Sequence, residues 1–174
     1  PLNSDAEISL TPYLDGNIQN RDANYDEKFW NEVAKETGYA QAVLVLETKP
    51  NPFGVEQFQV ATAMQFTLEV DGEPFDFQCT PLKDEKWVGG ALRVPTLAGQ
   101  KLTLFKYAVN LSSTNYPKHE LAARASQKVQ AVATKGYTKL RQEQAAAWEA
   151  RWHTNDIQIE GDVSAQQGIR FTIF

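Results

Sequence analysis

The chain has 174 residues, enough for one domain or for one domain with an appendage. Its hydrophobic fraction of 42% and charged fraction of 22% are ordinary for a globular protein, and its apolar runs all fall short of the roughly 18–20 residues of a membrane span. A net charge of −5 argues against nucleic acid and against anionic membrane as partners, because both need clustered Lys and Arg.

The beginning of the chain predicts a strand, a loop and a short helix. Residues 7–14 alternate and predict a strand that a proline interrupts, and Asp15-Gly16 predicts a turn. Residues 15–27 are dense in Asn and Asp, whose side chains bond to nearby backbone, and predict an ordered loop. Residues 28–35 predict one or two turns of helix.

The middle of the chain predicts antiparallel strands. Residues 39–48 contain a short, partly β-branched apolar run, which is typical of a buried strand. Residues 58–70 alternate in large part, and Asp71-Gly72 then gives the strongest short-range signal for a hairpin, with residues 75–79 as the return strand.

Two more strands are predicted over residues 87–94 and 100–110. The second has bulky side chains on both of its faces, with Leu102 and Leu104 on one and Phe105 and Tyr107 on the other. This pattern predicts cover on both sides, with a layer outside this chain as one source of it.

The pattern then changes to helical spacing. A first predicted helix ends at Gly136, and a second runs from about residue 138 to 153 with Trp148 and Trp152 one turn apart as a packing seam. Residues 157–159 predict a brief strand. Because the sequence stops inside an apolar run, we expect it to be a piece of a longer protein.

The Asn- and Asp-rich loop is a candidate calcium site. Its six oxygen-bearing side chains are Asp15, Asn17, Asn20, Asp22, Asn24 and Asp26. Their spacing lacks the central Gly and the final bidentate Glu of the twelve-residue calcium loop, so a turn-rich structural loop is the preferred interpretation.

Histidine and cysteine give no better case for a metal. His119 and His153 are far apart in sequence and lack a metal-binding spacing. The single cysteine, Cys79, excludes an internal disulfide and a cysteine-based zinc site, and an inert buried thiol is the preferred interpretation. We therefore expect no metal, and we expect a cytoplasmic protein, with which this cysteine usage is compatible.

Aromatic rings are the remaining candidates for a ligand site. Trp30 with Tyr25 and Phe29, or Trp87 alone, would offer a platform for a sugar ring, although packing is the preferred interpretation. The 22 acidic residues include no two that the sequence selects as a pair for glycoside cleavage, so no catalytic residue is named and the ligand-binding residues stay open.

Three segments together resemble the maltose phosphorylases and their relatives in glycoside hydrolase family 65. They are TPYLDGNIQNRDANYDEKFW (11–30), ETKPNPFGVEQFQVATAM (47–64) and GYTKLRQEQAAAWEARWHTNDIQIEGDVSAQQGIRFTIF (136–174). The third is the most specific, because it carries Gly-Tyr, Trp-x-x-x-Trp, Asp-Ile-x-Ile and Ile-Arg-Phe in order. The first favours the maltose-type members over the kojibiose and trehalose types.

The resemblance implies a mainly β chain with some α structure, an antiparallel β-sandwich that is part of a super-sandwich, followed by a helical linker hairpin. Residues 1–112 would be the sandwich segment, 113–156 the helical linker, and 157–174 the start of an (α/α)6 catalytic barrel. It also implies that the chain packs on its own barrel, and we expect a homodimer.

The implied chemistry is phosphorolysis of an α-linked disaccharide such as maltose, with inorganic phosphate as co-substrate and no cofactor. A single glutamic acid would protonate the leaving oxygen while phosphate attacks, and the resemblance places that acid downstream of Phe174. We therefore expect this chain alone to be inactive. The alternatives are a free-standing carbohydrate-binding sandwich, a family-65 α-glucoside hydrolase, and a plain interaction domain.

Overall fold

The computed structural model describes residues 3–19 and 28–172. Contacts within the chain divide it into two compact units, Pro1–Thr134 and Lys135–Phe174. We describe each unit by itself.

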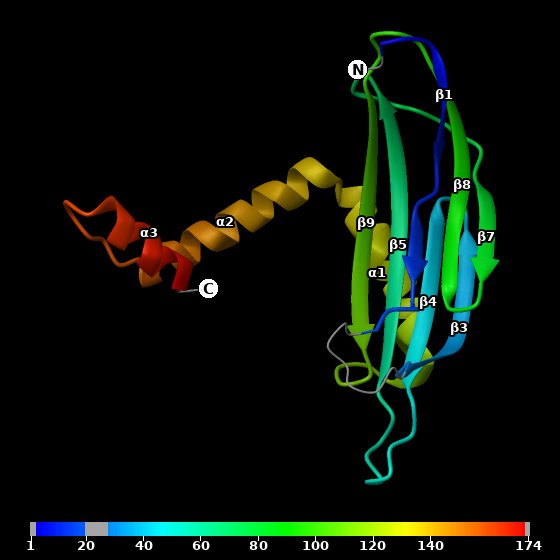
Figure 1. Ribbon diagram of the computed structural model, residues 1–174, viewed down its shortest axis with the longest axis horizontal. Coiled ribbons are helices and arrows are strands. Elements are labelled where there is room, and N and C mark those ends of the chain that lie inside the picture. Colours follow the sequence, from blue (N-terminus) through cyan, green and yellow to red (C-terminus); the bar gives the residue numbers. More distant parts are fainter. Residues whose placement is uncertain (1–2, 20–27, 173–174) are drawn as a thin grey trace. The chain divides into compact units, whose positions relative to one another are not determined.

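The first unit contains two antiparallel sheets (Figure 1). In one sheet, β8 (Trp87–Thr96) is the centre, and it pairs with β1 (Ala6–Leu10), β2 (Tyr13–Asp15) and β7 (Thr80–Asp84). The other sheet comprises β3 (Trp30–Gly38), β4 (Gln41–Thr48), β5 (Gln59–Val70), β6 (Glu73–Pro74) and β9 (Leu102–Ser112), with β5 between β4 and β9. The predicted antiparallel sandwich is confirmed.

Alternation along the strands builds the core between the two sheets. On β5, Met64, Phe66 and Leu68 point to this core and are at most 2% exposed, while Thr67 between them is not buried. Val88 and Val94 of β8 face them from the other sheet and are fully buried. Each strand therefore contributes one face to the core, as a period of two residues requires.

Helix α1 (Leu121–Lys135) covers the second face of the larger sheet. Leu121, Ala125 and Val129 repeat at helical spacing and are all 0% exposed. Gln41 of β4 donates to Ser126 Oγ at 2.6 Å and accepts from Gln130 Nε2 at 3.0 Å, which fixes the helix to the sheet.

The predicted cover on both faces of β9 is present within this chain. Tyr107 and Leu111 are buried on the face toward α1, while Leu102 and Leu104 pack against the core between the sheets. Helix α1 therefore supplies the cover for which a layer outside the chain had been one suggested source.

The short helix predicted over residues 28–35 is wrong. Trp30–Gly38 form β3, which pairs with β4 through a two-residue turn whose second residue, Ala40, has φ 50°. The register shifts between Glu32 and Ala34, so the strand carries a bulge at Val33. An extra residue breaks the period of two, and this irregularity hid the strand from pattern reasoning.

The return strand predicted over residues 75–79 is also wrong, although its turn is confirmed. Asp71 and Gly72 have φ values of 53° and 91°, as a tight hairpin turn needs, but β6 consists of Glu73–Pro74 only. Residues 75–79 then lie outside any ladder, and the chain continues into β7 of the other sheet. Phe75 and Phe77 still pack against the core, so their alternation reflects burial without pairing.

The second unit contains α2 (Tyr137–Asn155) and α3 (Val163–Thr172), and neither helix has a buried residue. Gly136, with φ 79°, separates α1 from α2 as predicted. Residues 157–159 form no strand. No helix among the described residues is both long and apolar enough to cross a membrane.

Candidate functional site

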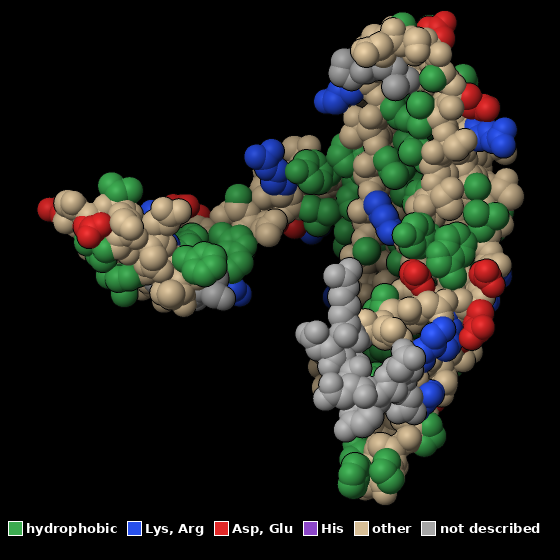
Figure 2. Space-filling view, viewed as in Figure 1, with side chains coloured by type: hydrophobic (Ala, Val, Ile, Leu, Met, Phe, Trp, Pro, Cys, Tyr) green, Lys and Arg blue, Asp and Glu red, His purple; other side chains and the backbone are tan. Residues whose placement is uncertain are grey.

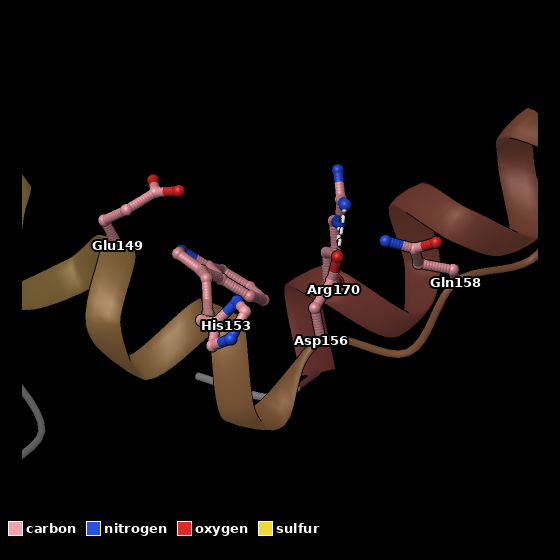
Figure 3. A pocket seen from close by; sticks show the side chains of 6 residues that line it. Glu149, His153, Asp156, Gln158 and Arg170 are labelled. Carbon is pink, nitrogen blue, oxygen red and sulfur yellow. Dashed lines mark hydrogen bonds and ion pairs between the residues drawn. The ribbon is translucent and has the colours of Figure 1, made fainter.

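An open pocket of about 560 Å³ lies in the second unit, where α2 ends and α3 returns (Figure 3). Its walls come from the last turns of α2, from the connecting segment and from α3, and the lining residues are Glu149, Trp152, His153, Asp156, Gln158 and Arg170. Glu149 and His153 are four residues apart on α2, so one helical face supplies both.

The centre of this pocket is an ion pair. Arg170 donates from Nε to Asp156 Oδ1 at 2.9 Å and from a terminal nitrogen to Asp156 Oδ2, and its guanidinium lies 5.9 Å from the centre of the Trp152 ring. The hydrogen bond from Arg170 lowers the pKa of Asp156 below its ordinary value, and the pKa of Arg170 is raised in return.

This arrangement limits the chemistry that the pocket can perform. Asp156 stays ionised at neutral pH because its pKa is lowered, so it does not supply the proton that a leaving glycosidic oxygen needs. Both oxygens of Asp156 already accept from Arg170, so the guanidinium is engaged by a carboxylate and is not a free clamp for phosphate. The pair ties α3 back to the end of α2, which is a structural role.

The connecting segment is held by one amide side chain. Gln166 of α3 accepts from the backbone N–H of Ile159 at 2.6 Å and donates to the carbonyl of Ile157 at 2.8 Å. Backbone polar groups outside secondary structure need partners, and here a side chain provides them for two such groups. Residues 157–159 therefore have hydrogen-bond partners although they form no ladder.

A second pocket, of about 410 Å³, lies on the four-stranded sheet beside Trp87. The ring of Trp87 stacks with that of Tyr13 at 5.3 Å between centroids and 23° between planes. Lys106 donates to the carbonyl oxygen of Tyr13 at 2.6 Å, and burial lowers the pKa of this lysine. Tyr13 was absent from the predicted aromatic sites, because only the register of β2 on β8 brings it to Trp87.

The predicted calcium ligands fall into two groups. Asn20, Asp22, Asn24 and Asp26 lie outside the described residues, as does Tyr25. Asp15 and Asn17 make turn contacts: Asp15 Oδ1 accepts from the Asn17 backbone N–H at 2.8 Å, and Asn17 Nδ2 donates to the carbonyl of Glu85 at 2.9 Å. In the part of the chain that the structure describes, no three His, Cys, Asp or Glu residues are grouped to hold a metal ion.

The remaining candidates are dispersed. Trp30 begins β3 and is half-buried. It belongs to the larger sheet, whereas the stacked rings of Tyr13 and Trp87 belong to the four-stranded sheet. His119 Nε2 lies 3.6 Å from Glu120 Oε1 in the first unit, whereas His153 lines the pocket of the second unit. Cys79 is half-buried and burial raises its pKa, so it is a neutral thiol at neutral pH.

Comparison with known proteins gives a consistent result. Residues 1–151 match the sequence model of glycosyl hydrolase family 65, N-terminal domain. The chain is 36% identical to maltose phosphorylase of Bacillus subtilis (strain 168), over 99% of this chain and 22% of that protein. It is 24% identical to α,α-trehalose phosphorylase of Thermoanaerobacter brockii, over 100% of this chain and 22% of that protein.

The fold has a solved counterpart. A putative kojibiose phosphorylase from human microbiome superposes with a TM-score of 0.77 at 20% identity, over 97% of this chain and 21% of that one. The chain thus spans about a fifth of the length of the proteins it matches. With the family model matched over most of its residues and the resemblance to maltose phosphorylases confirmed, the chain belongs to glycosyl hydrolase family 65, in its N-terminal domain.

Proposed function

We propose that this chain is the non-catalytic N-terminal and linker part of an inverting disaccharide phosphorylase that converts maltose and phosphate to β-glucose 1-phosphate and glucose. One observation carries this proposal: the 36% identity to a maltose phosphorylase over 99% of the chain. The other relatives reported above are also disaccharide phosphorylases by name, but they are named for other disaccharides. They therefore support phosphorolysis as the reaction class and do not add support for maltose as the substrate.

The proposed reaction balances with one acid and one nucleophile. An oxygen of phosphate bonds to the anomeric carbon as the glycosidic bond breaks, and a carboxylic acid gives its proton to the departing oxygen of glucose. Phosphate replaces the water of an inverting hydrolase, so no general base is required. We assign that acid and the phosphate site to the catalytic barrel of the whole protein, and to no residue of this chain.

The helices support a linker role. Helix α2 has 19 residues and none of them is buried, and Trp148 and Trp152 lie one turn apart on it. We propose that this face packs on the catalytic barrel. The family divisions at residues 1–112, 113–156 and 157–174 remain part of the proposal, with α1 as the part of the linker that the larger sheet holds in place. A homodimer and a cytoplasmic location are proposed with it.

The decisive experiment uses the full-length protein that carries this chain. We expect glucose 1-phosphate to form from maltose only when phosphate is present, and faster than from trehalose or kojibiose. Release of glucose at an unchanged rate without phosphate would assign the protein to the hydrolase relatives instead. A faster reaction with trehalose or kojibiose would keep the class and replace the substrate.

The linker role has its own test. The 174-residue chain alone is expected to release no glucose 1-phosphate in the same assay. In the full-length protein, Trp148→Ala with Trp152→Ala should lower the thermal midpoint and the activity together, whereas Arg141→Ala, at an exposed position of the same helix, should change neither.

A further inference from the structure

The outer face of the four-stranded sheet places a carboxylate on each side of one indole. In the register of the sheet, Trp87 of β8 pairs with Asp15 of β2 on one side and with Asp84 of β7 on the other. Directly paired residues of an antiparallel ladder project from the same face, with Cβ atoms about 4.5–5.5 Å apart. Leu14 and Val88, the next residues along their strands, point into the core, so the other three side chains point outward.

Gly89 provides the space for the indole. A Cβ on Gly89 would lie 3.0 Å from Trp87 Cη2 and 2.9 Å from Tyr13 Cβ, closer than side chains ordinarily pack. The indole therefore reaches over the glycine toward Tyr13, with which it stacks. Lys106 Nζ lies 5.7 Å from the centre of the Tyr13 ring and donates a hydrogen bond to the Tyr13 backbone carbonyl. This lysine of the other sheet therefore helps to hold the ring pair in place. Tyr13 is 48% exposed, so the pair reaches the surface.

The two turns at the rim of the pocket are hydrogen-bonded to each other without a ligand. Asp15 Oδ1 accepts from the Asn17 backbone N–H, and Asn17 Nδ2 donates to the Glu85 carbonyl. The Gly16 N–H donates to the Lys86 carbonyl at 2.7 Å. These bonds connect the turn after β2 to the turn between β7 and β8. A ligand would meet a preformed surface and would not have to order either turn, which lowers the cost of binding.

We propose that this surface, made of Tyr13, Asp15, Asp84 and Trp87, binds a neutral saccharide. A pyranose ring presents an apolar C–H face that suits an aromatic ring, and hydroxyl groups that donate to carboxylates. Asn17 also lines the pocket, and the second N–H of its side-chain amide adds a donor for sugar oxygens.

Other ligand classes fit less well. Two carboxylates beside the rings repel phosphorylated sugars and nucleic acids. A hard cation needs six or more oxygen ligands, whereas Asp15 and Asp84 stand on opposite sides of Trp87. Figure 2 shows acidic and basic side chains interspersed with hydrophobic ones on the face in view, without a large patch of one sign.

The test follows the full-length protein by native electrophoresis through gels with increasing glycogen. The choice of an α-glucan rests on the proposed function, but retardation requires no phosphorolysis, so the two proposals fail separately. We expect glycogen to retard the protein and carboxymethylated glycogen to retard it less. Trp87→Ala should raise the apparent dissociation constant for glycogen at least tenfold.

Two further variants keep the result interpretable. Asp15→Asn with Asp84→Asn retains the Oδ1 acceptors of both turns and should weaken binding at least threefold, even if Trp87→Ala fails to fold. The matched control is Tyr39→Ala, which removes another exposed, stacked ring at a different hairpin and should stay within twofold. Absence of retardation, or equal retardation of the protein and both pocket variants, would overturn the proposal.

Discussion

The carbonyl oxygen of Pro12 lies 2.7 Å from the position that a Cβ on Gly89 would take. The same oxygen accepts a hydrogen bond from the backbone N–H of Gly90 at 3.0 Å. The chain entering β2 thus lies so close to β8 that residue 89 has no room for a side chain. Because the obstructing atom belongs to the backbone, a rotamer change cannot relieve the contact.

Gly89→Ala should therefore destabilise the sandwich by about 1–3 kcal/mol, the usual cost of forcing extra atoms into a packed site. Denaturation in urea, followed by circular dichroism, measures the change. Gly38→Ala is the matched control, because the new Cβ would lie 3.9 Å from its nearest neighbour, Gln41 Cβ, and the φ of Gly38 is outside the left-handed region. That variant should be neutral or stabilising by up to about 1 kcal/mol. Equal stabilities for the two variants would contradict the close approach of Pro12.

Leu121 should behave as a core residue of the sandwich although it begins a helix. It is 0% exposed and lies on the α1 face that covers the larger sheet. Leu121→Ala is expected to lower the free energy of unfolding by about 2–5 kcal/mol, because it leaves a cavity under the helix. Gln127→Ala on the exposed side of α1 should change it by less than about 0.5 kcal/mol. If Leu121→Ala were equally mild, α1 would not be part of the sandwich.

Much of the fold could be predicted because its strongest local signals agree with the tertiary structure. The alternation of β5 and the turn at Asp71-Gly72 both appear where expected. β3 was missed because the bulge at Val33 breaks the period of two, and the segment with Phe75 and Phe77 was misassigned because burial alternates there without pairing. The alternation of apolar residues indicates which side chains are buried. Whether a segment also pairs as a strand depends on the tertiary path of the chain.

The candidate sites depended on information that a single sequence does not contain. Trp87 was identified as a possible platform, but its partner Tyr13 and the flanking Asp84 become neighbours only through the register of three strands. Likewise, nothing in the spacing of Asp156 and Arg170 indicates an ion pair, since a turn and most of α3 separate them. Residue type was informative for Trp87 only, and both juxtapositions required the fold.

The pair of Asp156 and Arg170 should make the attachment of α3 dependent on pH. The pKa of Asp156 is lowered in the folded chain, so the pair stabilises above the ordinary pKa of an aspartate, about 3.9. Its contribution is lost as the pH falls through the lowered pKa. We expect the NMR titration of the Asp156 carboxyl to have its midpoint below that ordinary value.

Arg170→Gln provides the comparison for this titration. Without the guanidinium, the Asp156 midpoint should move up toward its ordinary value, and the contribution of the pair should vanish at neutral pH. A midpoint for Asp156 that is the same in both proteins would show that the pair does not form in solution.

Gln166 should determine whether the segment between α2 and α3 keeps its shape. Its side chain makes both a bond to the Ile159 N–H and a bond to the Ile157 carbonyl, at 2.6 and 2.8 Å. A single hydrogen bond of this kind contributes about 0.5–1.5 kcal/mol, so Gln166→Ala should speed amide exchange at Ile159 several-fold, up to about tenfold. Hydrogen exchange followed by NMR gives the rate at that one amide.

Two substitutions separate the bond from the helix that carries it. Gln167→Ala, at the neighbouring exposed position of α3, should leave exchange at Ile159 unchanged. Gln166→Glu keeps an acceptor for the Ile159 N–H but loses the donor to Ile157, so it should protect that amide better than Gln166→Ala does. Equal exchange in Gln166→Ala and Gln167→Ala would mean that the segment is ordered by other contacts, and the role assigned to Gln166 would then be wrong.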